Sequence, residues 1–135
     1  MKWNVKKLSD VGKIYTGKTP NTSDQSNFNG NIPFATPSDL HGKIIKNTNR
    51  HISEKAMKSL AYVREGSALV GCIGDVGKVG YASVPMTFNQ QINAIEWNNE
   101  IINDKYGYYI LLYMANVLKR KAVSSVVPIL NKTIN

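Results

Sequence analysis

The segment Gly74-Asp75-Val76-Gly77-Lys78-Val79-Gly80 leads within a few residues to Asn89-Gln90-Gln91, which lies inside an apolar run. Glycines let the backbone approach a ligand closely, and lysine neutralises phosphate. An amide side chain can form two hydrogen bonds to the edge of one base. The apolar runs over 67–73, 79–84 and 91–97 are short and separated by glycine or proline, as is typical of a meandering or mixed sheet. This stretch therefore predicts a strand-rich domain with a surface that suits nucleic acid better than catalysis.

The chain before this stretch predicts loops and short elements. Ser9 and Asp10 predict a short turn of helix that runs into residues 11–15. Residues 17–30 are almost all polar and turn-forming, which predicts a long exposed loop. Residues 31–36 predict an edge strand, because Pro33 cannot donate a ladder hydrogen bond. Ser53 is placed to cap a helix that continues to Leu60.

The chain after this stretch predicts one long helix that starts near Asp104. Its apolar residues recur at helical spacing, and its aromatic side chains are expected to anchor the core: Tyr106, Ile110, Tyr113, Met114, Val117 and Leu118. We therefore expect one α/β domain over residues 1–135, with a mixed, strongly twisted sheet and a long C-terminal helix.

Length and composition favour an ordered globular domain. A chain of 135 residues with 42% hydrophobic content can bury a real core, since a chain of this size buries about two thirds of its unfolded surface. No apolar run approaches the roughly 20 residues that cross a bilayer, and the polar start does not predict a signal peptide, so we expect a cytoplasmic protein with no membrane partner. The only cysteine, Cys72, excludes an internal disulfide and is expected to be buried. The net charge of +8 favours a polyanionic partner without proving one.

The sequence does not match the catalytic and nucleotide-binding motifs that we compared with it. A P-loop requires glycine where Cys72 stands and serine or threonine where Val79 stands. The dinucleotide fingerprint requires a helix directly after Gly80, and none is predicted there. His41 and His51 have no nucleophile motif near them, and no carboxylate pair stands out. We therefore expect no catalytic residue, no cofactor and no metal site.

Polar and basic residues form the predicted DNA-binding set. The loop over 17–30 offers adaptable donors and acceptors, and its lysine is placed to hold a phosphate. The amides at 89–91 have two interpretations that the sequence leaves equal: they contact bases, or they bond to backbone and stabilise the fold. By contrast, residues 36–39 are expected to be structural, with Asp39 bracing a loop. The predicted set is Lys18, Thr19, Asn21, Thr22, Ser23, Gln25, Asn27, Lys46, Arg50, Lys78, Asn89, Gln90 and Gln91.

Ordered motifs along nearly the whole chain resemble a known family. They are Gly17-Lys18-Thr19-Pro20, the segments over 30–40 and 50–56, Glu65-Gly66-Ser67, and the segments over 74–80 and 88–95. In this order they resemble the target recognition domain of the DNA specificity subunit of Type I restriction-modification systems.

This resemblance implies a non-catalytic domain that recognises double-stranded DNA. Members usually carry two such domains joined by long helices, each contacting one half of a split target, while other subunits supply methylation and cleavage. We expect one recognition domain here, without the spacer helix and the second recognition domain. Docking of the methyltransferase and restriction subunits is expected to require those helices. Two alternatives stay open: a recognition domain detached from a fused restriction-methylation enzyme, and a non-catalytic decoy or interaction module for methyltransferase subunits.

Overall fold

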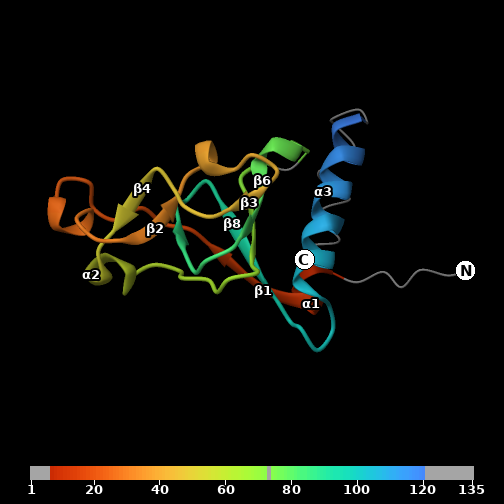
Figure 1. Ribbon diagram of the computed structural model, residues 1–135, viewed down its shortest axis with the longest axis horizontal. Helices are drawn as coiled ribbons and strands as arrows, with labels where there is room; N and C mark the ends of the chain where they lie inside the picture. The colour runs from red at the N-terminus through yellow and green to blue at the C-terminus, as the bar shows by residue number, and fades with distance from the viewer. Residues whose placement is uncertain (1–6, 73, 121–135) are drawn as a thin grey trace, which may run out of the picture.

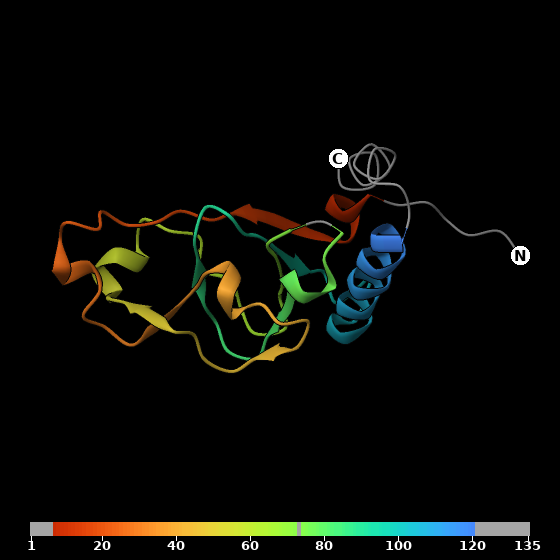
Figure 2. The same ribbon diagram turned by 90° about the horizontal axis from the view of Figure 1, so that it is seen from above.

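The computed structural model describes residues 7–72 and 74–120 and has an elongated shape, with α3 (Asp104–Arg120) at one end (Figures 1 and 2). A five-stranded sheet adjoins α3, and a three-stranded sheet lies toward the other end. The expected α/β class, mixed strand pairing and C-terminal helix are confirmed. The strands divide between two sheets, where one sheet was expected.

Short strands build both sheets. The five-stranded sheet has the order β1 (Gly12–Thr16), β8 (Asn93–Trp97), β5 (Ala68–Val70), β6 (Val79–Ala82) and β3 (Ile44–Ile45). The three-stranded sheet has the order β4 (Arg50–Ile52), β2 (Ile32–Ala35) and β7 (Thr87–Phe88). The five-stranded sheet has three antiparallel pairs and one parallel pair, β3 with β6. The three-stranded sheet has one antiparallel pair, β2 with β4, and one parallel pair, β2 with β7.

Short helical elements connect the strands. The α-helices before α3 are α1 (Leu8–Val11) and α2 (Glu54–Met57). Three 3-10 turns are η1 (Gln25–Asn27), η2 (Pro37–Asp39) and η3 (Val76–Lys78). The predicted cap at Ser53 is confirmed, because its hydroxyl accepts a hydrogen bond from the Ala56 N–H (3.2 Å). The helix it caps is shorter than expected.

Residues 12–16 form a strand, so the expected helical turn does not extend to Tyr15. A helical turn does form as α1, but it begins earlier than expected: Lys7 is its N-cap, and Ser9 and Asp10 lie within the turn. The Asp10 carboxylate accepts a hydrogen bond from the Lys7 N–H (3.0 Å). β1 then pairs along its whole length with β8, from Gly12 opposite Trp97 to Thr16 opposite Asn93. This long-range pairing decides the conformation of the segment.

The prediction of an edge strand at Pro33 is wrong, because β2 is the central strand of its sheet. β7 pairs only with Phe34 and Ala35, so the ladder on that side begins after the proline. The Pro33 carbonyl instead accepts a hydrogen bond from the Thr87 hydroxyl (2.8 Å). A central strand thus accommodates proline where its missing N–H is not required.

Three apolar clusters hold the domain together. The largest includes Leu69, Met86, Phe88 and Ile92, all fully buried. A second joins the five-stranded sheet to α3, and a third packs Phe34 and Ile52 against α2. Each fully buried large side chain contributes about 1.5–3 kcal/mol relative to exposure.

The start of α3 at Asp104 is confirmed, but the expected core face is partly wrong. The buried side comprises Gly107, Tyr108, Leu111, Ala115 and Leu118, whereas Tyr106, Tyr109 and Tyr113 are 57%, 59% and 68% exposed. A Cβ at Gly107 would lie 2.5 Å from the Trp97 ring, so the side of the helix that contains Gly107 packs closely against the sheet. The three tyrosines therefore face outward. Among the described residues, no helix combines the length and apolar character needed to span a membrane.

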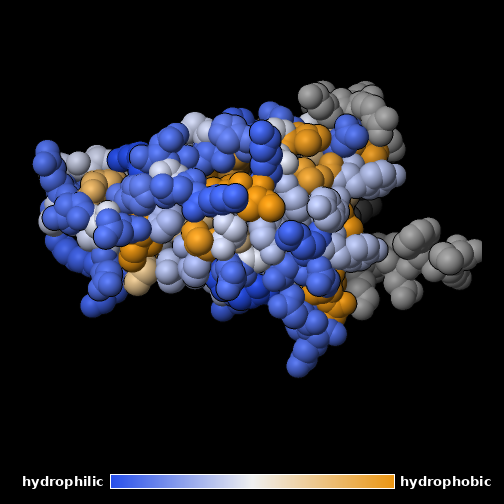
Figure 3. All heavy atoms as spheres, viewed as in Figure 1, coloured by the Kyte–Doolittle hydropathy of each residue, from blue (hydrophilic) through white to orange (hydrophobic). Residues whose placement is uncertain are grey.

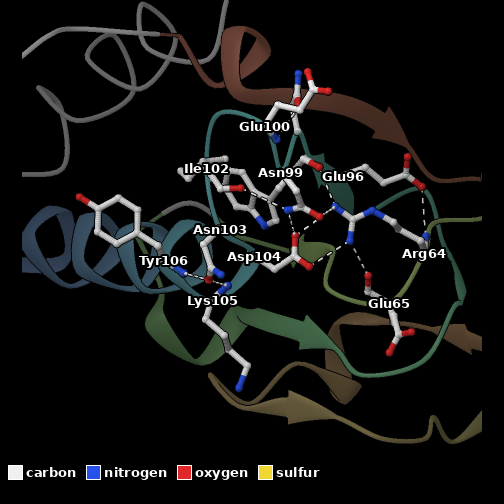
Figure 4. A network of polar contacts seen from close by, with 12 residues as sticks. Arg64, Glu65, Glu96, Asn99, Glu100, Ile102, Asn103, Asp104, Lys105 and Tyr106 are labelled. Carbon is white, nitrogen blue, oxygen red and sulfur yellow. Dashed lines mark hydrogen bonds and ion pairs between the residues drawn. The ribbon is translucent and has the colours of Figure 1, made fainter.

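Arg64 joins the start of α3 to the five-stranded sheet (Figure 4). Its guanidinium donates to both carboxylate oxygens of Asp104, at 3.0 Å each, and to the Trp97 carbonyl at 2.6 Å. Asn99 donates to the same carboxylate (2.8 Å). Burial by itself raises the pKa of Asp104, but the hydrogen bonds from Arg64 and Asn99 and the charge of Arg64 outweigh it and lower the pKa below the usual value.

The lowered pKa of Asp104 predicts an acid-sensitive contribution to folding. The contribution is fully present above the pKa of an unfolded aspartate, about 3.9, and is lost as pH falls through the lower pKa of the folded state. We therefore expect the difference in free energy of unfolding between wild type and Asp104→Asn to shrink as pH falls from about 5 to about 2. Urea unfolding across this range measures it, with exposed Glu100→Gln as the control. A constant difference would contradict the prediction.

Candidate nucleic-acid interface

The base of the polar loop over 17–30 docks onto the turn that carries the predicted amides. The Gly17 N–H donates to the Ile92 carbonyl and the Lys18 N–H to the Phe88 carbonyl, both at 3.2 Å. The Thr19 hydroxyl donates to the Gln90 side-chain carbonyl. Two segments about 70 residues apart in sequence, each predicted to meet nucleic acid, therefore form one surface.

Gly17 is the residue that permits this docking. A Cβ at this position would lie 2.0 Å from the Asn89 carbonyl oxygen and 2.6 Å from the Phe88 ring. Only glycine fits so close to another stretch of backbone. Gly17 therefore sets the direction in which Lys18 and Thr19 leave the sheet.

The loop itself is an ordered structure. The Asn21 side-chain carbonyl accepts hydrogen bonds from the Ser23 N–H (3.0 Å) and hydroxyl (2.7 Å). Asp24 caps η1 through the Ser26 N–H and forms an ion pair with Lys55 (3.1 Å). Hydrogen bonds from Ser26, followed by that from Lys55, lower the pKa of Asp24. The loop is thereby tied to the start of α2.

Two amides of the predicted set are buried beneath the surface. Asn27 donates from its side chain to the Asn21 carbonyl (3.0 Å), and its own carbonyl accepts from the Ser53 N–H (2.9 Å). The Asn89 side-chain carbonyl accepts from the Gln91 N–H (3.0 Å). Both side chains are under 10% exposed, so they brace the loop and the turn. For Asn89, this geometry favours the structural alternative over base contact.

The other members of the set lie at the protein surface. Lys18, Asn21, Thr22, Ser23, Gln25, Lys46, Arg50, Gln90 and Gln91 are exposed, and Thr19 is half-buried. The segment over 17–60 carries six lysines and arginines against three acidic residues. Of those acids, Asp24 is paired with Lys55 and Asp39 is buried. Figure 3 shows this end of the molecule as mainly hydrophilic, with apolar side chains gathered nearer α3.

The structure does not bring Lys78 to the loop. Figures 1 and 2 place η3 beside α3, far from η1. The Lys78 ammonium donates to the Pro37 carbonyl (3.2 Å), at the start of η2. In that turn, Asp39 accepts hydrogen bonds from the Thr36 N–H (2.8 Å) and the Asn49 N–H (2.9 Å), which confirms its expected bracing role.

A hollow of about 250 Å³ lies between the five-stranded sheet and α3. Gly74 and Gln91 line it, together with apolar residues such as Ile95 and Leu111. Cys72 also lines it and is exposed, so the expectation of a buried thiol is wrong. The reason is local: β5 ends at Val70, and Cys72 lies in the connection after it. Among the described residues, no group of three or more His, Cys, Asp or Glu side chains could hold a metal ion.

Residues 1–134 match the Type I restriction modification DNA specificity domain. The chain belongs to this family. The family that the ordered motifs indicated is therefore confirmed.

Relatives of this specificity domain are much longer proteins. The MjaIX specificity subunit of Methanocaldococcus jannaschii is 34% identical over 113 residues, covering 80% of this chain and 26% of the relative. The HindI specificity subunit of Haemophilus influenzae is 38% identical over 96 residues, covering 69% and 21%. The chain thus spans about a quarter of the length of the curated relatives it matches.

Solved structures share the fold of this specificity domain. The HsdS subunit from Thermoanaerobacter tengcongensis matches with a TM-score of 0.64 and 21% identity over 86% of this chain and 28% of its own. A chain from a structure titled for complex assembly and conformational transition of the type I R-M system matches with a TM-score of 0.65 and 22% identity, over 85% and 28%.

Sequence reasoning missed several residues that position the interface of the specificity domain. Lys55 anchors the loop through Asp24, Thr48 bonds to both β2 and β4, and Phe28 lies against Arg50. An isolated phenylalanine inside a polar loop is a usable signal for Phe28. Lys55 pairs with Asp24, and Thr48 accepts from Phe34 as well as bonding to nearby Arg50, so each has a partner distant in sequence that local patterns do not indicate.

Proposed function

We propose that this chain recognises double-stranded DNA sequence-specifically, contacting one half of a split target as the specificity component of a Type I restriction-modification system. The observation that carries the proposal is the docking of the loop base, at Lys18 and Thr19, onto the turn at Gln90. The joint surface offers cations for phosphates together with adaptable amides and hydroxyls for base edges. Membership in the specificity family supports the same function.

The proposed contacts divide into two kinds. Lys18 and Lys46 are exposed cations that hold phosphates without regard to sequence. Gln90 keeps its side-chain N–H₂ available while its carbonyl accepts from Thr19, and Asn21 and Gln25 lie exposed in the loop. Asn27 and Asn89 support these residues from below. Lys78 would serve as a separate phosphate contact, on the side of the molecule near η3.

The partners follow from the same proposal. Methyltransferase and restriction subunits would supply methylation and cleavage, and this chain would catalyse neither reaction. Such a domain works where chromosomal DNA lies, which is the cytoplasm in a bacterium or archaeon. The alternative is that the chain is a recognition domain detached from a fused restriction-methylation enzyme. Such a domain would present the same surface to DNA, and only the source of the catalytic activity would differ.

Salt-dependent binding tests the phosphate contacts. We expect the chain to bind duplex DNA with an affinity that falls steeply as salt rises, and Lys18→Ala to weaken binding to every sequence and reduce the salt slope by about one unit. Lys105→Ala on α3, at the opposite end, is the matched control and should leave the slope nearly unchanged. Fluorescence anisotropy at several salt concentrations measures both. Equal effects of the two substitutions would contradict a local interface.

Sequence preference tests the amide contacts. Gln90→Ala is expected to cost about 1–3 kcal/mol on a duplex selected by the wild-type chain and much less on a scrambled duplex. Circular dichroism confirms that the variant is folded. An equal loss on both duplexes would remove Gln90 from the base-contacting set.

A further inference from the structure

Arg50 holds its guanidinium over two aromatic rings. The guanidinium carbon lies 4.8 Å from the centre of the Phe28 ring and 5.6 Å from that of Phe34. Phe34 is fully buried, and Arg50 is exposed at the surface above it. A cation–π contact of this kind restricts where the guanidinium can move while leaving its N–H groups accessible.

The backbone beneath Arg50 is also fixed. Arg50 on β4 pairs directly opposite Phe34 on β2. The buried Thr48 hydroxyl accepts a hydrogen bond from the Phe34 N–H (3.0 Å) and donates to the Arg50 carbonyl (2.6 Å). Phe28 ends η1, so the guanidinium lies beside the polar loop. The backbone of Arg50 and its guanidinium are therefore both positioned before any ligand binds.

The donors of Arg50 are not committed inside the fold. Over residues 7–72 and 74–120, the ion pairs join Lys55 to Asp24 and Arg64 to Asp104, and no carboxylate pairs with Arg50. Arg64 shows the contrast, because Asp104 and the Trp97 carbonyl occupy its donors. Within the described residues, Arg50 is therefore held in place while its guanidinium N–H groups remain available to a ligand.

We infer that Arg50 recognises a guanine in the half-site, donating two hydrogen bonds to its O6 and N7 atoms in the major groove. This inference rests on the proposed function. A phosphate requires only positive charge, which Lys18 and Lys46 supply, whereas a guanidinium held in place over two rings offers a planar pair of donors for two acceptors on one base edge. Phe28 then acts as a positioning residue for Arg50.

Selection from random duplex DNA tests the inference with the full chain. The wild type is expected to select a half-site with one strictly required guanine. Arg50→Lys keeps the charge but not the planar pair of donors, so it should weaken the preference at that one position. Arg50→Ala removes every donor and should abolish the preference there, and both variants should preserve it elsewhere. Lys18→Ala is the control, which should weaken binding and leave the selected sequence unchanged.

A base analogue tests the same contact without changing the protein. Replacing the required guanine by 7-deazaguanine removes the N7 acceptor. Wild-type affinity should fall by up to the roughly 5- to 150-fold expected for a bidentate base contact, and the affinity of Arg50→Ala should not change. Phe28→Leu should reduce discrimination at this position and leave binding to a scrambled duplex unaltered.

The outcomes separate the inference from the proposed function. A selected half-site that tolerates 7-deazaguanine at every guanine would overturn the role of Arg50 and leave sequence-specific binding intact. Uniform weakening of all sequences by Arg50→Ala, with binding by Arg50→Lys close to that of the wild type, would make Arg50 a phosphate contact and also overturn the inference. If the wild type selects no sequence at all, the proposed function fails and the inference fails with it.

Discussion

Replacing Gly17 with alanine is expected to lower the free energy of unfolding by about 3 kcal/mol, the upper part of the range for overpacking a tight contact. The added methyl group would lie 2.0 Å from the Asn89 carbonyl oxygen, which belongs to the backbone of the turn and cannot rotate away. Relief requires the loop to separate from the turn over 88–92. Urea denaturation followed by circular dichroism measures this loss.

The same substitution should also damage the proposed interface. Separation would break the hydrogen bonds from Gly17 to Ile92 and from Lys18 to Phe88. We expect affinity for a selected duplex to fall by roughly tenfold or more, the effect of about 1.4 kcal/mol. Gly77→Ala is the matched control, because a Cβ there meets only the Asp75 carboxylate at 3.3 Å. Equal behaviour of the two variants would show that the docked loop base is unimportant.

Removing the Arg64 side chain is expected to destabilise the fold by about 2–3 kcal/mol, a figure lowered from that of a fully buried pair because Arg64 is partly exposed. The substitution Arg64→Ala leaves Asp104 without its bidentate partner and the Trp97 carbonyl without its donor. These contacts tie the start of α3 to the end of β8, so the helix should loosen first (Figure 4). Hydrogen exchange at the α3 amides measures the local loosening, and a urea unfolding curve measures the overall loss of stability.

Conservative variants show whether geometry or charge matters at Arg64. Arg64→Lys keeps the charge but cannot form two parallel hydrogen bonds to one carboxylate, so it should recover only part of the loss. A double-mutant cycle with Asp104→Asn should give a coupling energy of at least about 0.5 kcal/mol. Additive effects of the two substitutions would mean that the pair does not stabilise the domain.

Local patterns in the sequence were sufficient for the family and for most of the elements. Glycine and proline separate the short apolar runs that became β5, β6 and β8, and Asp104 begins the long helix. Turn-forming residues over 17–30 predicted the exposed loop, and the ordered motifs predicted the specificity family. These features depend on neighbouring residues, which is why the sequence carries them directly.

Only the tertiary structure decided which of the predicted residues lie together. The close contact of Gly107 with Trp97 turns Tyr106 and Tyr113 outward, although their spacing alone predicts a core face. The docking of Gly17 joins the loop to Gln90, whereas η3, the turn that carries Lys78, packs against α3.

The sequence by itself therefore determined the family, the strand-rich class and the chemical types available for DNA contact. The tertiary structure decided which amides are buried, as with Asn27 and Asn89, and which cation is held in place, as with Arg50 against Phe28 and Phe34. The physical reason is that burial and stacking arise from residues far apart in the chain. Such contacts are determined by the packing of the whole domain, and the local conformational preferences of the residues do not predict them.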